Sequence, residues 1–234
     1  MSNQYINTII SKEGSAAYSH PLISSIRKIK GRHLPVKTMK VSAGADQKRS
    51  GGKVQHNAID ISIPVGTPVY AIADSIVLST NQLPNSKSGI YKKHGGTSSS
   101  KCGSSVNLKV PHPGSPTGYT YVGYCHLSQV NPKLKKGMKI PGGTILGYSG
   151  GKPGAPGAGN TTGPHLHLTI RPGDDKWKSN SLSGKNEVYN TWFQGANADG
   201  VDYGWSKVLA YGGFATAGIL TTILGWMIYK RKVF

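Results

Sequence analysis

Apolar and polar residues alternate along several short segments of the chain, which is the pattern of strands that bury one face. Ile59, Ile61 and Ile63 alternate with small or polar side chains, and this period of two predicts a half-buried strand. Similar apolar runs bounded by turn residues predict further strands at 69–79 (one strand or a pair), 106–110, 119–127, 144–149 and 165–170. No long amphipathic helix interrupts this series. We therefore expect a mostly β fold built on an antiparallel sheet.

Segments rich in glycine, proline and serine separate the predicted strands. The sequence Pro-Val-Gly-Thr-Pro at 64–68 predicts a turn, and the polar segments 81–105 and 152–164 predict long loops. The chain holds 32 glycines in 234 residues, about twice the usual ~7%, which favours a turn-rich β protein over a helical bundle. Residues 173–206 show no firm periodicity, so we interpret them as an irregular linker.

The C-terminal region departs sharply from this pattern. Residues 208–229 form a run of 22 residues without a charge, inside a predicted helix at 207–230. A helix of this length spans about 33 Å, enough to cross a hydrocarbon core of ~30 Å. A Lys-Arg-Lys sequence follows the run, and aromatic residues lie near both of its ends. We expect a single-pass membrane helix followed by a basic tail at 231–234.

The side of the membrane that holds the preceding domain stays open. Residues 1–20 lack a basic start followed by an apolar core, so we expect an N-terminal extension and no secretory signal peptide. Positive charge after the span favours a cytoplasmic tail, but that orientation requires export of the whole domain without a signal. A virion membrane removes this requirement. The sequence therefore predicts location in a bacterial inner membrane or in a phage virion membrane.

Two pairs of side chains on the predicted strands are of the types that bind metals. His56 and Asp60 lie four residues apart, and His165 and His167 lie two apart, so each pair shares one face of an extended chain. Imidazole nitrogens and a carboxylate oxygen suit Zn²⁺, and two histidines plus one carboxylate leave the fourth tetrahedral position open for water. Each pair alone is a weak signal, because both patterns occur by chance.

Longer sequence signatures surround both pairs. HNAIDISIPVGTPVYAIADSIV at 56–77 is similar to the first signature of the lysostaphin-like zinc endopeptidases, His-x-Gly-x-Asp followed by Pro-x-Gly-Thr-Pro-Val. Three later segments, YCHLS at 124–128, KKGMKIPGGTILGYSG at 135–150 and TTGPHLHL at 161–168, resemble the other signatures of that family in the same order. The resemblance covers about half of the chain.

The resemblance implies a role for each of five residues. The zinc ligands of the family match His56, Asp60 and His167, and its two catalytic histidines that do not bind the metal match His126 and His165. The family's glycine between the first two ligands is Ala58 here, and its methyl group could crowd the metal face. The sequence offers no HExxH glutamate as a base, and histidine, with an ordinary pKa of about 6.5, is the natural substitute.

The resemblance also implies an architecture and a function. We expect a peptidase domain at 21–172, with an antiparallel sheet and long loops around a groove, that cleaves peptide cross-links of bacterial peptidoglycan with Zn²⁺. The formal net charge of +19 fits an anionic cell envelope. Diffuse charge and the lack of a recognised motif argue against nucleic acid as a specific partner.

Several alternatives remain open at the level of sequence. The same fold would suit a non-catalytic regulatory module, or a structural membrane protein of a virus particle in contact with capsid proteins. A phage lytic enzyme used in entry would combine a membrane anchor with hydrolysis. The predicted hairpin brings Cys102 near Cys125, so a disulfide and two separate thiols are both compatible with the sequence. The histidines without a partner pattern are expected at the surface; they are His20, His33, His94 and His112.

Overall fold

The protein is described here by a computed structural model. The described residues are 21–45, 47–49, 54–83, 101–173, 186–194 and 196. The elements are α2 (Pro21–Ile26), β1 (Val41–Ala43), β2 (Lys48–Arg49), β3 (Val54–Gln55), β4 (Ile59–Ile61), β5 (Pro68–Tyr70), β6 (Ser75–Asn81), β7 (Ser104–Pro111), β8 (Tyr119–Val130), β9 (Lys139–Ile140), β10 (Ile145–Ser149), β11 (Leu166–Pro172) and α5 (Asn186–Phe193).

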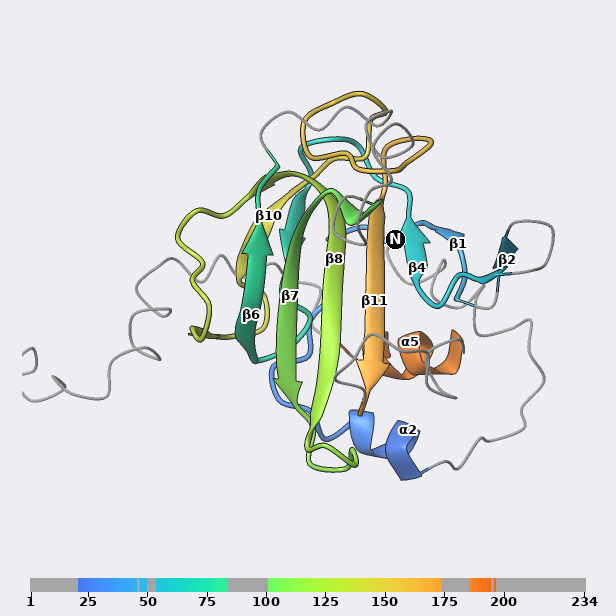
Figure 1. Ribbon diagram of the computed structural model, residues 1–234. Coiled ribbons are helices and arrows are strands. Elements are labelled where there is room, and N and C mark those ends of the chain that lie inside the picture. Colours follow the sequence, from blue (N-terminus) through green and yellow to red (C-terminus); the bar gives the residue numbers. More distant parts are fainter. Residues whose placement is uncertain are drawn as a thin grey trace, which may run out of the picture.

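One antiparallel sheet dominates the part of the chain that the structure describes (Figure 1). Its strand order is β1-β4-β11-β8-β7-β6-β9, with β10 joined to β8 and to β5, while β2 and β3 pair separately. The long strands β7 and β8 form a hairpin in which Asn107 lies opposite Gly123. The predicted mostly β, antiparallel fold is confirmed, and so is the predicted hairpin.

The structure resolves one strand prediction and corrects another. The apolar run 69–79 is a pair of strands, one of the two predicted alternatives; β5 pairs with β10, and β6 pairs with β7 and β9. The strand at Ile59 is not half-buried, since Ile59, Asp60 and Ile61 are all buried. It lies between β1 and β11, and its polar face points into the site described below.

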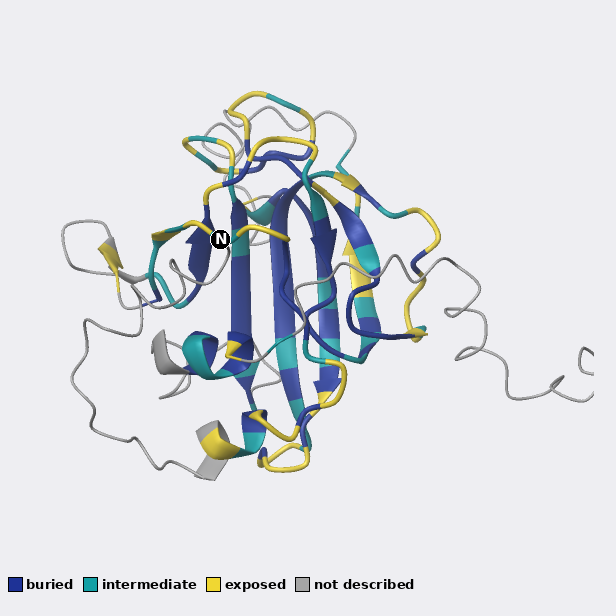
Figure 2. Cartoon of the chain, turned by 180° about the vertical axis from the view of Figure 1, so that it is seen from behind, coloured by how far each residue is buried: buried dark blue, intermediate teal, exposed yellow. Residues whose placement is uncertain are grey.

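The core lies on one face of the sheet, as the alternation of strand residues requires. On β7, Val106, Leu108 and Val110 are fully buried, whereas Asn107 and Lys109 between them are half-buried. Burial of each such apolar side chain stabilises the fold by roughly 1.5–3 kcal/mol. Figure 2 shows buried residues along the strands and exposed residues mainly in the connecting loops.

Helix α5 falls in the segment 173–206 that the sequence predicts to be irregular, so that prediction is wrong at Asn186–Phe193. Its buried residues recur at helical spacing and form one stripe; they are Val188, Tyr189, Trp192 and Phe193. The Trp192 indole donates a hydrogen bond to the Ile72 carbonyl oxygen at 3.2 Å. The Arg32 guanidinium donates to carbonyl oxygens of the last turn and so caps the helix. The packed domain therefore extends beyond residue 172.

The predicted membrane helix at 207–230, the extension 1–20 and residues 84–100 of the predicted loop lie outside the described residues. No helix among the described residues has the length and apolarity that a membrane crossing requires.

Candidate metal and catalytic site

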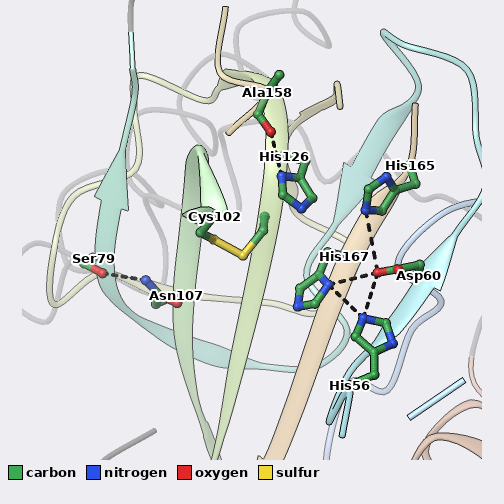
Figure 3. Close-up of a disulfide and its surroundings, with 10 residues drawn as sticks. His56, Asp60, Ser79, Cys102, Asn107, His126, Ala158, His165 and His167 are labelled. Atoms are coloured by element: carbon green, nitrogen blue, oxygen red, sulfur yellow. Dashed lines mark hydrogen bonds and ion pairs between the residues drawn. A yellow bond between two sulfur atoms is a disulfide. The ribbon is translucent and has the colours of Figure 1, made fainter. Parts of the chain in front are cut away.

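Two neighbouring strands bring the predicted ligands together. Strand β4 pairs with β11 so that Asp60 lies directly opposite His167, and opposed side chains on one sheet face lie about 5 Å apart at Cβ. Strand β11 also pairs with β8, which places His167 opposite Cys125. The site therefore spans three adjacent strands at one end of the sheet (Figure 3).

His56 reaches this site through a turn and not along an extended strand. It precedes β4, and Asn57 has a φ of 54°, a left-handed conformation that asparagine adopts more readily than most residues. The expectation that His56 and Asp60 share a face because the chain is extended is therefore wrong in its reason, although the two side chains do converge. Ala58 is buried and, unlike Asn57, needs no positive φ. The methyl group of Ala58 does not separate His56 from Asp60, since His56 Nε2 lies 3.2 Å from Asp60 Oδ1.

Three donor atoms converge in the geometry of a metal site. His167 Nδ1 lies 2.9 Å from Asp60 Oδ1, His56 Nε2 lies 3.2 Å from the same oxygen, and the two histidine nitrogens are 3.2 Å apart. Zinc bonds of about 2.0–2.1 Å in a tetrahedral site place neighbouring ligand atoms about 3.3 Å apart. The separations and the N,N,O donor set therefore fit Zn²⁺.

The hydrogen bond of His56 and the pKa shifts of Asp60 and His167 also fit a cation. His56 Nδ1 donates a hydrogen bond to the Gly44 carbonyl oxygen at 3.1 Å, which leaves the Nε2 lone pair directed at the site. Burial alone would raise the pKa of Asp60, but the adjacent His167 and His56 rings outweigh burial and hold that pKa well below its usual range. Burial lowers the pKa of His167. A neutral imidazole and an ionised carboxylate are the forms that bind zinc.

His126 adjoins this cluster because of an irregularity in β8. Between the pairs Ser104–Leu127 and Val106–Tyr124, β8 contains one residue more than β7, and His126 adopts a φ of 63°. This β-bulge redirects the side chain. The centroid of the His126 ring therefore lies 4.7 Å from that of His165 and 5.8 Å from that of His167.

The two histidines outside the ligand set are held in the same tautomer. His126 Nδ1 donates to the Ala158 carbonyl oxygen at 2.7 Å, and His165 Nδ1 donates to the Gly163 carbonyl oxygen at 2.8 Å. Each ring therefore directs its Nε2 away from these carbonyls, and His165 Nε2 lies 3.6 Å from Asp60 Oδ1. Burial, and then the nearby rings of His165 and His167, lower the pKa of His126 to about 3.

All five residues singled out from the sequence thus lie in one cluster. Among the described residues, metal-type donors within reach of one another form two sets that share His167: one with His56 and Asp60, the other with His126 and His165. Only the first includes a carboxylate, so it is the set whose donors match a site of two histidines and one carboxylate. The supporting carbonyls of Gly44 and Ala158 left no signal in the sequence, because a backbone carbonyl is common to all residue types.

The structure also tests the predictions for the two cysteines and for the histidines outside this cluster. Cys102 and Cys125 form a disulfide, which resolves the open alternative in favour of the bond. His33 and His112 are buried and hydrogen-bonded, so the prediction that they are surface histidines is wrong. His33 Nδ1 bonds to the carbonyl oxygen of the neighbouring Leu34, whereas His112 Nε2 bonds to Ser25, 87 residues earlier in the chain. His20 and His94 lie outside the described residues.

More than half of the chain matches a known protein family. Residues 54–180 match the model of Peptidase family M23. The chain is 31% identical over 115 residues to the peptidoglycan DD-endopeptidase ShyA of Vibrio cholerae serotype O1, covering 49% of this chain and 20% of that protein. For the DD-endopeptidase ShyB of the same organism the identity is 24% over 134 residues, covering 56% and 24%. The chain thus spans about a quarter of the length of these relatives or less.

The chain is also similar to solved structures. The catalytic domain of lysostaphin from Staphylococcus simulans is 23% identical, with a TM-score of 0.44, and the alignment covers 65% of this chain and 92% of that domain. A zinc-containing peptidase from Vibrio cholerae is 23% identical, with a TM-score of 0.40 and coverage of 62% and 36%.

Proposed function

Because the chain belongs to Peptidase family M23, we propose that it is a zinc-dependent endopeptidase that cleaves peptide cross-links of bacterial peptidoglycan. The observation that carries the proposal is the convergence of His56, Asp60 and His167 within 3.2 Å of one another, with two further histidines beside them. Such a cluster provides both metal ligands and proton-transferring groups. A purely structural module would need neither.

His56, Asp60 and His167 would hold the ion and leave one tetrahedral position for the reactants. A zinc ion bound there lowers the pKa of water and polarises a carbonyl oxygen. The protein keeps the ligands rigid: β4 and β11 fix Asp60 against His167, and the Gly44 carbonyl orients His56.

His126 and His165 supply the proton transfers in this mechanism. Each presents an Nε2 lone pair that can accept a proton from an attacking water molecule. Once protonated, either ring can donate a hydrogen bond to the oxygen that becomes negative as the peptide carbonyl is attacked, or a proton to the leaving amine. Their Nδ1 atoms remain bonded to Ala158 and Gly163, so the rings need not reorient.

The substrate assignment rests on charge and on the relatives. ShyA and ShyB are described as peptidoglycan DD-endopeptidases, and the formal net charge of +19 would favour encounter with a polyanionic wall. This attraction should weaken as salt is added.

We also propose that residues 208–229 anchor the enzyme in a membrane, on the basis of their 22-residue uncharged run and the basic residues after it. A lytic enzyme carried in a phage membrane and used in entry would need both a wall-cleaving domain and such an anchor.

The direct test is hydrolysis of purified peptidoglycan sacculi by the full chain in detergent. We expect turbidity to fall and peptide fragments to appear, whose masses identify the bond that is cut. A chelator should stop the reaction, and added zinc should restore it. A zinc-loaded chain that releases no fragments from any wall type would contradict the proposal.

A further inference from the structure

We propose that the disulfide between Cys102 and Cys125 positions His126 for hydrolysis, so that its reduction lowers turnover while the metal ligands stay in place. This inference rests on the proposed function and adds a redox control to the same site. It assigns a role to a bond that the hydrolytic chemistry itself does not use.

The bond lies against the reactive cluster (Figure 3). Cys125 immediately precedes His126 and lies opposite His167 on the neighbouring strand. Cys125 is therefore next in sequence to one predicted catalytic histidine and across the sheet from a predicted ligand. It also stands at the bulge of β8 that gives His126 its positive φ.

The other half of the disulfide holds the loop that orients His126. Two backbone hydrogen bonds of 2.9 Å join the Cys102 segment to this loop, one from Ser104 N to Gly157 O and one from Asn160 N to Lys101 O. The two segments lie so close that a Cβ at Gly103 would collide with the Gly157 carbonyl oxygen.

Ala158 lies between these two anchor points, and its carbonyl oxygen accepts the hydrogen bond from His126 Nδ1. The disulfide thus closes a ring of contacts. It runs from His126 to Ala158, through the paired backbones to Cys102, and through the sulfur atoms back to Cys125. Without the bond, only non-covalent contacts would hold the Ala158 carbonyl opposite His126 and maintain a left-handed conformation that is uncommon for residues other than glycine.

Reduction of the bond is sterically accessible. Cys125 is buried, but Cys102 is half-buried and follows the exposed Lys101. A phosphine reductant cleaves the S–S bond with one water molecule, giving two thiols while the phosphine becomes its oxide. Because disulfides form and persist in oxidising compartments, the enzyme would be less active in a reducing cytoplasm and fully active where the wall lies.

The test compares the oxidised chain, the chain reduced with a phosphine, and the double variant Cys102→Ser/Cys125→Ser. A phosphine is preferred because thiol reductants bind zinc. The variant Ser25→Ala is the matched control, since it removes a hydrogen bond to His112 at the far end of the hairpin. Each form is assayed for kcat and KM on wall peptide, for zinc content, and for the Nδ1–H proton resonance of His126 after labelling of histidine with nitrogen-15. The resonance is assigned by its loss in His126→Ala.

Reduction and the double substitution should each lower kcat by roughly tenfold or more, with KM nearly unchanged and about one zinc per chain retained. The His126 Nδ1–H resonance should broaden or exchange rapidly in both, and reoxidation should restore it only in the wild type. Ser25→Ala should leave all these quantities as they are.

An unchanged resonance and kcat would overturn the proposal, and so would loss of zinc or unfolding, because the bond would then act on the whole fold. If even the oxidised chain fails to hydrolyse wall peptide, the proposed function fails, yet the resonance still decides whether the disulfide positions His126.

Discussion

His112 links helix α2 to the β7–β8 hairpin, and its burial predicts a loss of stability in acid. The imidazole is fully buried, with Nε2 2.7 Å from Ser25 Oγ and Nδ1 2.7 Å from Thr120 Oγ1. The neutral ring satisfies both hydroxyls, as donor to one and acceptor from the other. Burial lowers the pKa of His112 to about 4, because the charged form would lose its hydration.

The sign of the effect follows from proton binding in the two states. The unfolded chain binds a proton at this histidine near the ordinary pKa of 6.5, whereas the folded protein does so only near pH 4. Between these values the unfolded state holds more protons, so the free energy of unfolding rises with pH. The stabilisation is fully present above pH 6.5 and is lost as the pH falls towards 4. The pKa difference corresponds to roughly 3 kcal/mol.

Denaturant unfolding of the chelator-treated wild type and of His112→Gln, at a series of pH values from 7 to 4, isolates this contribution. We expect the variant to be less stable at pH 7, because glutamine fills the buried site imperfectly. On acidification it should lose roughly 3 kcal/mol less than the wild type, since the remaining histidines titrate alike in both chains. Equal pH dependence in the two proteins would refute the burial of a neutral His112.

Three further predictions concern catalysis, packing and anchoring. His126→Ala and His165→Ala should each keep about one zinc but lower hydrolysis by roughly 10²–10⁴-fold; wild-type rates in both would make these histidines structural. Trp192→Ala should lower the free energy of unfolding by about 3–5 kcal/mol, as seen by thermal or denaturant melting, because this side chain is fully buried and hydrogen-bonded; a change below 1 kcal/mol would place α5 outside the folded unit. The full chain should float with lipid vesicles in a density gradient, whereas a chain ending at residue 206 should not; equal flotation would argue against an anchor at 208–229.

The strands of this fold were predictable because their apolar residues alternate over several positions, as Val106, Leu108 and Val110 do on β7. Helix α5 was not predicted, although Val188, Tyr189, Trp192 and Phe193 recur at helical spacing. Eight residues are too few for a helix to be stable by itself, and its order comes from contacts such as that of Trp192 with Ile72. Tertiary packing of this kind leaves little trace in the local sequence.

The candidate site was predicted mainly through resemblance, since the spacing of His56 and Asp60, or of His165 and His167, says little alone. The position of His126 depends on a bulge whose positive φ has no glycine to mark it. The burial of His112 depends on Ser25, which lies 87 residues earlier in the chain. Contacts between such distant segments become visible only when the sheet brings them together.

In the proposed function, His56, Asp60 and His167 bind the one zinc ion that hydrolysis requires. Metal analysis of the dialysed full chain, of Asp60→Ala and of Asp74→Asn tests this assignment. Asp74→Asn is the control, because the Asp74 carboxylate accepts a hydrogen bond from Gly142 N and is not among the site's donors. We predict about one zinc per chain, with wall hydrolysis, in the wild type and the control, and loss of both zinc and hydrolysis in Asp60→Ala. Stoichiometric zinc in Asp60→Ala would contradict the assignment.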